Sequence, residues 1–386
     1  MASKGSPKPV NENTNYLLVA SYAILAGLWG LSQKVLVPVP INVVATSTAI
    51  VYIGCHRSLR LRDPHDEEGN VKSAEDREVM TQKDAMKFPL VGSCALFGLY
   101  LLFKFLDKDL VNLLLSLYFS AIGCFTIGVS LDPFVRAALG AVMSAAALKK
   151  QFGKVLKLPV LGDLDLRVTF SETLSLICGA VFSFYYFKTK HWTLNNIFGI
   201  SFCIQGMERI SIGSYKIGAI LLSGLFFYDI FWVFGTEVMV TVAKSFDGPI
   251  KLLFPRAWAT EEAKAQFSML GLGDIVIPGV FVALLLRYDA HKADERTFSD
   301  HALFPKPFFN ANITGYALGL ATTLFVMYQF NAAQPALLYL VPACLGASLL
   351  VALSKGQFKE LLAYSEEEEE EKDGDKKKGE EGKKDK

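Results

Sequence analysis

Long apolar runs recur along this chain, and they constrain its fold more than any other feature. Each run holds about twenty residues with few charges, enough at about 1.5 Å per residue to cross a bilayer core of about 30 Å. In lipid every backbone N–H and C=O group needs a partner within the protein, so such runs form helices. The sequence therefore predicts an all-α, polytopic membrane protein with a bundle of about nine transmembrane helices. The runs lie at 36–55, 88–106, 110–131, 171–187, 194–210, 217–236, 268–287, 312–330 and 334–353.

The composition agrees with a protein embedded in membrane lipid. Hydrophobic residues make up 52% of the 386, and the mean hydropathy is +0.32. The net charge is only +1, and the charges collect in the connections and the C-terminal tail, so no nucleic-acid partner is expected. The six cysteines lie within or beside apolar runs and form no Cys-x-x-Cys pair. This pattern argues against a disulfide framework and a metal site, and we expect no cofactor.

The distribution of charge and hydropathy divides the chain into four parts. Lysine and arginine are enriched in the loop at 56–87 and in later connections, which places these connections and the C-terminus in the cytosol. The parts are an N-terminal segment at 1–35, the first transmembrane helices at 36–210, the helices that carry the candidate site at 211–353, and a charged tail at 354–386.

The two ends of the chain hold features of their own. The apolar stretch at 16–31 could be a cleaved signal, an extra helix or a re-entrant segment. The tail contains six consecutive glutamates at 366–371 and cannot bury apolar area, so we expect it to be disordered. Lys383 and Lys384 near its end resemble a dilysine signal for retrieval to the endoplasmic reticulum.

Two aspartates stand alone inside apolar runs. Asp229 lies in GAILLSGLFFYDIFWVFGT and Asp274 in SMLGLGDIVIPGVFVALLLRY. A carboxylate in hydrocarbon costs about 2.5–3.5 kcal/mol on insertion scales, so each is a candidate functional group. If the two runs are antiparallel neighbours, both carboxylates lie about 9–10 Å below the same membrane surface. We therefore expect them to form a pair.

A carboxylate pair suits peptide hydrolysis. One ionised group takes a proton from water while the other, protonated, polarises the scissile carbonyl, and like charges held close share one proton. Gly271 and Gly273 precede Asp274 and allow the backbone or a substrate to approach closely. Tyr228 beside Asp229 could donate a hydrogen bond, act as a gate or simply pack.

Other functions also use buried carboxylates. A proton-coupled transporter would place paired carboxylates in the membrane, and it would be favoured by inverted repeats, which the sequence does not display. A binding or quality-control factor for membrane proteins would bind similar segments without catalysis, and would tolerate the loss of either aspartate.

Three motifs in order carry a resemblance to a known family. They are Tyr228-Asp229, Gly271-Leu272-Gly273-Asp274 and Gln334-Pro335-Ala336-Leu337, each on a successive apolar run or at its start. Together they resemble the presenilin-type GxGD intramembrane proteases. The strings FFYDIFWVFGTEVMVTVAKSFDGPIKLLFP, MLGLGDIVIPG and QPALLYLVPA are similar to the signal peptide peptidase branch of that family.

The resemblance implies a presenilin-like bundle of nine helices with Asp229 and Asp274 as an aspartyl protease dyad. It implies that Gln334, Pro335, Ala336 and Leu337 pack beside the active site, with Tyr228, Gly271 and Gly273 supporting it. Its implied substrates are leftover signal peptides and type II membrane segments. It further implies a multi-pass protein of the endoplasmic reticulum, with a homo-oligomer and quality-control proteins as possible partners. Residues 238–242 form a β-branched run just after the run that holds Asp229. As a hypothesis, this run or its neighbour pairs as a strand with an unwound substrate, and the alternative is a helix extension or a plain loop.

Overall fold

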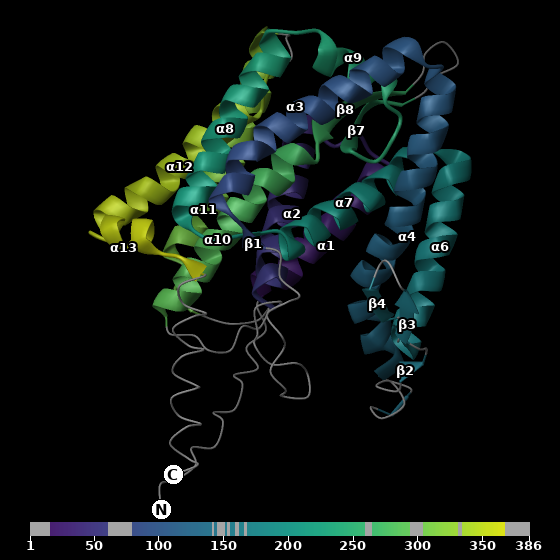
Figure 1. The fold of residues 1–386 in the computed structure, drawn as a ribbon, viewed down its shortest axis with the longest axis horizontal. Coiled ribbons are helices and arrows are strands. Elements are labelled where there is room, and N and C mark those ends of the chain that lie inside the picture. Colours follow the sequence, from purple (N-terminus) through teal and green to yellow (C-terminus); the bar gives the residue numbers. More distant parts are fainter. Residues whose placement is uncertain are drawn as a thin grey trace, which may run out of the picture.

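The fold is given by a computed structural model of the chain (Figure 1). The structure describes residues 16–60, 79–140, 143–144, 151–152, 155–158, 162–165, 168–258, 265–293, 304–330 and 334–366. The dilysine and most of the glutamate run lie outside these residues.

Helices dominate the described chain, as the apolar runs predict. Nine of the described helices hold 18 residues or more, and seven of these are long and apolar enough to cross a membrane by length and composition. The helices are α1 (Tyr16–Ser32), α2 (Val39–Arg60), α3 (Gln82–Phe105), α4 (Lys108–Gly140), α6 (Phe170–Thr189), α7 (Trp192–Arg209), α8 (Tyr215–Phe234), α9 (Val238–Ser245), α10 (Gly273–Lys292), α11 (Pro307–Phe330), α12 (Leu337–Ser354) and α13 (Phe358–Ala363). The all-α polytopic class is confirmed.

Short strands connect the helices. They are β1 (Val79–Met80), β2 (Gln151–Phe152), β3 (Val155–Leu158), β4 (Gly162–Asp165), β5 (Val168–Thr169), β6 (Ser211–Ile212), β7 (Lys251–Ala257) and β8 (Gln266–Gly271). At the end of the bundle where α2 ends and α8 begins, β1 pairs in parallel with β6. The described ends of the predicted loop at 56–87 are therefore ordered, because α2 runs to Arg60 and β1 precedes α3.

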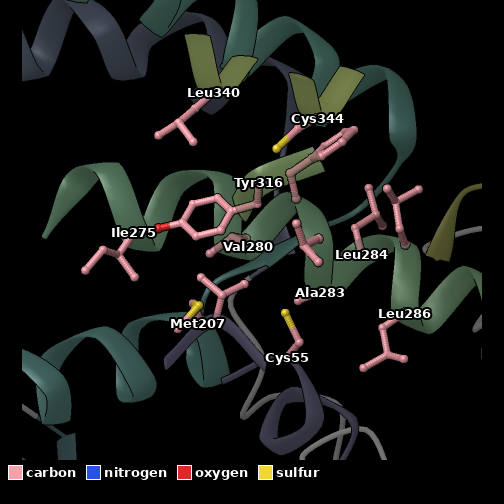
Figure 2. Close-up of a cluster of buried hydrophobic side chains, with 14 of the residues drawn as sticks. Cys55, Met207, Ile275, Val280, Ala283, Leu284, Leu286, Tyr316, Leu340 and Cys344 are labelled. Atoms are coloured by element: carbon pink, nitrogen blue, oxygen red, sulfur yellow. The ribbon is translucent and has the colours of Figure 1, made fainter. Parts of the chain in front are cut away.

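Helix α10 forms the centre of the bundle (Figure 1). It contacts α2, α7, α8, α11 and α12, and every residue from Pro278 to Ala290 is buried. Figure 2 shows Cys55 and Met207 on one side of α10 and Leu340 and Cys344 on the other. Because neighbouring helices surround it, α10 can carry charged residues that a lipid-facing helix could not.

Two pairs of helices lie around this centre. Helices α4 and α6 pack along each other at one side of the molecule (Figure 1), and a Cβ atom at Gly179 would come within 2.3 Å of the Cys124 carbonyl oxygen. Such close backbone approach is typical of small residues between membrane helices. On another side α1 packs against α2, and α1 contains the whole apolar stretch at 16–31.

The predicted run at 268–287 is wrong at its start. Residues 266–271 form strand β8, which pairs antiparallel with β7, and the helix begins only at Gly273. The apolar run continues through this boundary because β8 carries Phe267, Met269 and Leu270, so hydropathy alone does not mark it. The β-branched run at 238–242, in contrast, is helical within α9, so the strand hypothesis is wrong there.

The first part of the predicted disordered tail is folded. After α12 the chain turns through Gly356 into α13, and Ser365 then forms a β-bridge with Ser214. The Glu366 N–H donates to the Gly213 carbonyl at 2.8 Å, and its carboxylate pairs with Arg287 at 2.7 Å. Both charged side chains are buried, so the prediction of disorder from 354 onward is corrected for residues 354–366. The sequence concealed this because Glu366 is the first of six identical residues.

We expect Glu366→Gln to destabilise the protein, because it leaves the buried Arg287 guanidinium without its counter-charge. Breaking a buried ion pair costs about 3–5 kcal/mol when one partner is removed, and the retained amide should hold the loss near the lower figure of about 3 kcal/mol. Thermal unfolding of the purified protein in detergent measures this. The control is Glu360→Gln, since Glu360 pairs with Lys292 at the surface and should contribute under about 1 kcal/mol. Equal melting temperatures for the two variants would contradict the structural role of Glu366.

Candidate active site

Asp229 lies in the C-terminal half of α8 and faces the start of α12. Its side chain is 4% exposed, and its Oδ2 atom accepts a hydrogen bond from the Leu337 N–H at 2.9 Å. Leu337 is the first residue of α12, and the first N–H groups of a helix have no partner within the helix. The Asp229 carboxylate thus satisfies one such group and lies at the positive end of the helix dipole.

The segment before α12 presents that N–H to Asp229. Pro335 cannot donate from its backbone, and its carbonyl accepts the Leu338 N–H at 3.3 Å to close a tight first turn. The Gln334 side-chain oxygen accepts from the Tyr339 hydroxyl at 3.3 Å, while Ala336 is buried. The predicted motif at 334–337 therefore does meet Asp229, and it does so through its backbone.

Asp274 lies in the first turn of α10, directly after the β7–β8 hairpin. The Leu272 N–H donates to the Ile250 carbonyl at 3.0 Å, which ties the hairpin to the start of the helix. Asp274 is less buried than Asp229, with an intermediate exposure. The hairpin and the helix start together fix where this carboxylate lies.

The two glycines of the Gly-x-Gly-Asp motif differ in their surroundings. A Cβ atom at Gly271 would lie 3.3 Å from the Asp274 Oδ2 atom, which is tighter than ordinary van der Waals contact. A Cβ atom at Gly273 would meet nothing closer than the Ile277 Cδ1 atom at 3.8 Å. Gly271 is thus the position at which a side chain would crowd the Asp274 carboxylate.

The structure brings the two aspartates together. Helices α8 and α10 are in contact, and they carry Asp229 and Asp274, respectively. Both carboxylates lie toward the end of the bundle that carries the β7–β8 hairpin, because Asp229 is near the C-terminus of α8 and Asp274 near the N-terminus of α10. Across an antiparallel pair of helices these positions meet, as the depth argument from the sequence predicts.

Tyr228 lies on a different face of α8 from Asp229, since consecutive residues of a helix point about 100° apart. Its ring faces α3, where a Cβ atom at Gly92 would lie 3.6 Å from it, and its centroid lies 6.3 Å from that of Trp232. Of the roles the sequence allows for Tyr228, packing between α8 and α3 is the one these contacts describe.

The sequence did not reveal two further contacts of the site. The Leu337 backbone N–H, rather than a side chain of its motif, binds Asp229. The Tyr316 hydroxyl on α11 donates to the Asp274 backbone carbonyl at 3.4 Å. The only sequence signal for the second contact was Pro278, four residues after Asp274. Within the described part of the chain, no three His, Cys, Asp or Glu side chains gather in a way that could hold a metal ion.

Comparisons with known proteins agree with this arrangement. Residues 72–368 match the family model described as signal peptide peptidase. Human signal peptide peptidase is 40% identical over 323 residues, which cover 82% of this chain and 80% of the human protein. The mouse protein is 41% identical over the same coverage, and intramembrane protease 2 of Caenorhabditis elegans is 46% identical over 216 residues, 54% of this chain and 46% of that one. These matches do not favour a transporter or a non-catalytic binding factor; the chain belongs to the signal peptide peptidase family of intramembrane proteases.

Proposed function

We propose that the protein is an aspartyl endopeptidase that hydrolyses peptide bonds within transmembrane segments, with Asp229 and Asp274 as its catalytic dyad. The observation that supports the proposal is that Asp229 and Asp274 lie on contacting helices, α8 and α10, toward the same end of the bundle. Two carboxylates at such a site share one proton, so the pair supplies a general base and a general acid together.

In this mechanism the ionised carboxylate takes a proton from water, which attacks the scissile carbonyl. The protonated carboxyl donates its proton to the carbonyl oxygen as the tetrahedral intermediate forms. When the C–N bond breaks, the carboxyl that took the proton from water protonates the leaving amine, and the hydroxyl of the intermediate returns a proton to the other carboxylate as the new carboxyl group forms. The Leu337 N–H holds Asp229 through one oxygen, which leaves the other oxygen for water or substrate. Gly271 keeps the space next to the Asp274 Oδ2 atom open.

The proposed substrates are signal peptides left in the membrane and type II membrane segments. The printed names of the human and mouse relatives support this class, as does the placement of the dyad within apolar helices. A substrate helix must unwind before hydrolysis, because its backbone is fully hydrogen-bonded. Strand β8 ends at Gly271, three residues before Asp274, so the hairpin is a better candidate than residues 238–242 for pairing with an extended substrate.

We further propose that the protein resides in the endoplasmic reticulum membrane with its C-terminus in the cytosol. The basic connections support this orientation. A homo-oligomer and quality-control proteins of that membrane are the proposed partners.

The test of catalytic class uses the purified protein in lipid with a signal-peptide reporter. A peptide isostere whose hydroxyl mimics the tetrahedral intermediate is expected to inhibit cleavage, because an aspartyl dyad binds that hydroxyl between its carboxylates. The matched control is the same isostere with a methylene in place of the hydroxyl-bearing carbon, which should inhibit far less. Equal inhibition by both compounds, or inactivation by serine- or cysteine-directed reagents, would overturn the aspartyl assignment.

A further inference from the structure

Pro278 creates a gap in the backbone hydrogen bonding of α10 at the residue that carries the candidate catalytic carboxylate. In an α-helix the carbonyl of residue 274 accepts the N–H of residue 278, and proline has no N–H to donate. The proline ring also clashes with that carbonyl and pushes it away from the helix axis. The Asp274 carbonyl therefore needs a donor from another element, since a buried carbonyl without a partner costs free energy.

Tyr316 supplies that donor from α11. Its side chain is 0% exposed, and its hydroxyl donates to the Asp274 carbonyl oxygen at 3.4 Å. Figure 2 shows the Tyr316 hydroxyl extending toward α10 beside Ile275, in surroundings that are otherwise apolar. The hydroxyl thus lies in apolar surroundings, and its hydrogen bond is directed at the turn that holds Asp274.

We propose that Tyr316 is a positioning residue for Asp274, in which its hydroxyl takes the place of the backbone bond that Pro278 cannot make. The inference rests on the proposed role of Asp274 in the dyad. A carbonyl fixed from α11 also fixes the peptide plane, and with it the direction in which the Asp274 side chain leaves the backbone. The hairpin restrains this turn on the side before Asp274, through the Leu272 N–H and the Ile250 carbonyl. The Tyr316 hydroxyl restrains the Asp274 carbonyl itself.

The proposal distinguishes a specific role for the hydroxyl from simple packing of the ring. If only the ring matters, Tyr316→Phe retains it and should have no effect. If the hydroxyl replaces the missing backbone donor, its loss leaves the Asp274 carbonyl unpaired, and the carboxylate samples orientations that do not react. Restoring an N–H at position 278 should then make the hydroxyl unnecessary.

The experiment measures kcat, KM and thermal unfolding for Tyr316→Phe, Pro278→Ala and the double variant in lipid. For Tyr316→Phe we expect kcat to fall about five- to tenfold with KM nearly unchanged, as the loss of one neutral hydrogen bond predicts. Pro278→Ala should cut within about twofold of wild type, because the alanine N–H adds a donor while Tyr316 remains. The double variant should recover kcat to within about twofold of Pro278→Ala, which a merely structural tyrosine would not produce.

The matched control is Tyr288→Phe. Tyr288 is also buried, lies on α10 itself, and its hydroxyl has no hydrogen-bond partner among the described residues. Removing that hydroxyl should leave kcat unchanged, which separates loss of a buried hydroxyl from loss of a hydrogen bond to Asp274. Binding of the hydroxyl-bearing isostere gives a second readout, and it should weaken in Tyr316→Phe and not in Tyr288→Phe.

Three results would overturn the proposal. The first is a wild-type kcat in Tyr316→Phe, and the second is a double variant that is no faster than Tyr316→Phe alone. The third is an equal loss of kcat in Tyr316→Phe and Tyr288→Phe that parallels their loss of thermal stability. If Pro278→Ala does not fold, the comparison of Tyr316→Phe with Tyr288→Phe decides by itself. Failure here leaves the dyad intact as long as substitution of Asp274 itself stops cleavage, so the two proposals fail separately.

Discussion

Asp229→Asn and Asp274→Asn are each expected to abolish cleavage of a membrane-inserted signal-peptide reporter. Asparagine has the shape of aspartate and can keep the hydrogen bond to the Leu337 N–H, but it cannot exchange a proton with water or substrate. General acid and base catalysis contribute about 10²–10⁴-fold each, and a dyad that acts as a unit loses nearly everything with either member. We therefore expect kcat to fall by about 10³-fold or more in both variants.

The matched control for this prediction is Asp289→Asn, at a third buried aspartate in the same bundle. Asp289 lies on α10, is 3% exposed, and accepts the backbone N–H groups of Phe308 and Phe309 at 3.3 and 2.8 Å. Through these two contacts Asp289 caps the start of α11. An asparagine, with one uncharged side-chain oxygen, would cap this helix less well. Asp289→Asn should lower the melting temperature while each folded molecule still cuts. If the Asp229 or Asp274 variant cuts at the wild-type rate, catalysis does not depend on the dyad.

The candidate catalytic groups could be predicted from sequence because a charge in hydrocarbon is costly. Asp229 and Asp274 stand out in apolar runs, and each lies about six or seven residues from the end of its predicted run at the same membrane surface, so their common depth could be calculated. Asp289 and Arg287 did not stand out, because they lie near the end of the predicted run. Their burial depends on α11 and on residue 366, which are distant in sequence.

The remaining features depend on tertiary contacts that hydropathy does not encode. Strand β8 is as apolar as a helix start, so only its pairing with β7 distinguishes it. Glu366 is the same residue as its five neighbours in sequence, and its burial follows from meeting Arg287. The tyrosine that serves Asp274 lies 42 residues further along the chain, and any of several hydroxyls could have filled the gap left by Pro278.

The contact between Asp229 and α12 leads to the second large expected effect. Replacing Leu337 with its α-hydroxy acid analogue converts the preceding amide into an ester, which removes the N–H and keeps the side chain. The helix itself should form normally, because the first N–H groups of a helix have no partner within it. What is lost is a hydrogen bond to an ionisable group, worth about 1.5–3 kcal/mol. If the bond is fully used in the transition state, kcat should fall by about 10- to 150-fold.

The control for the ester is the same substitution one residue later, at Leu338. The Leu338 N–H donates to the Pro335 carbonyl at 3.3 Å, so an ester there weakens the same turn without touching Asp229. Each ester also makes the carbonyl of the preceding residue a weaker hydrogen-bond acceptor. Because both variants share this effect, the difference between their rates isolates the Asp229 contact. We expect the Leu338 ester to cut within about twofold of wild type, since it loses one long, neutral bond. Equal rates for the two esters would mean that the 334–337 motif acts through the shape of its side chains and not through the N–H group that Asp229 binds.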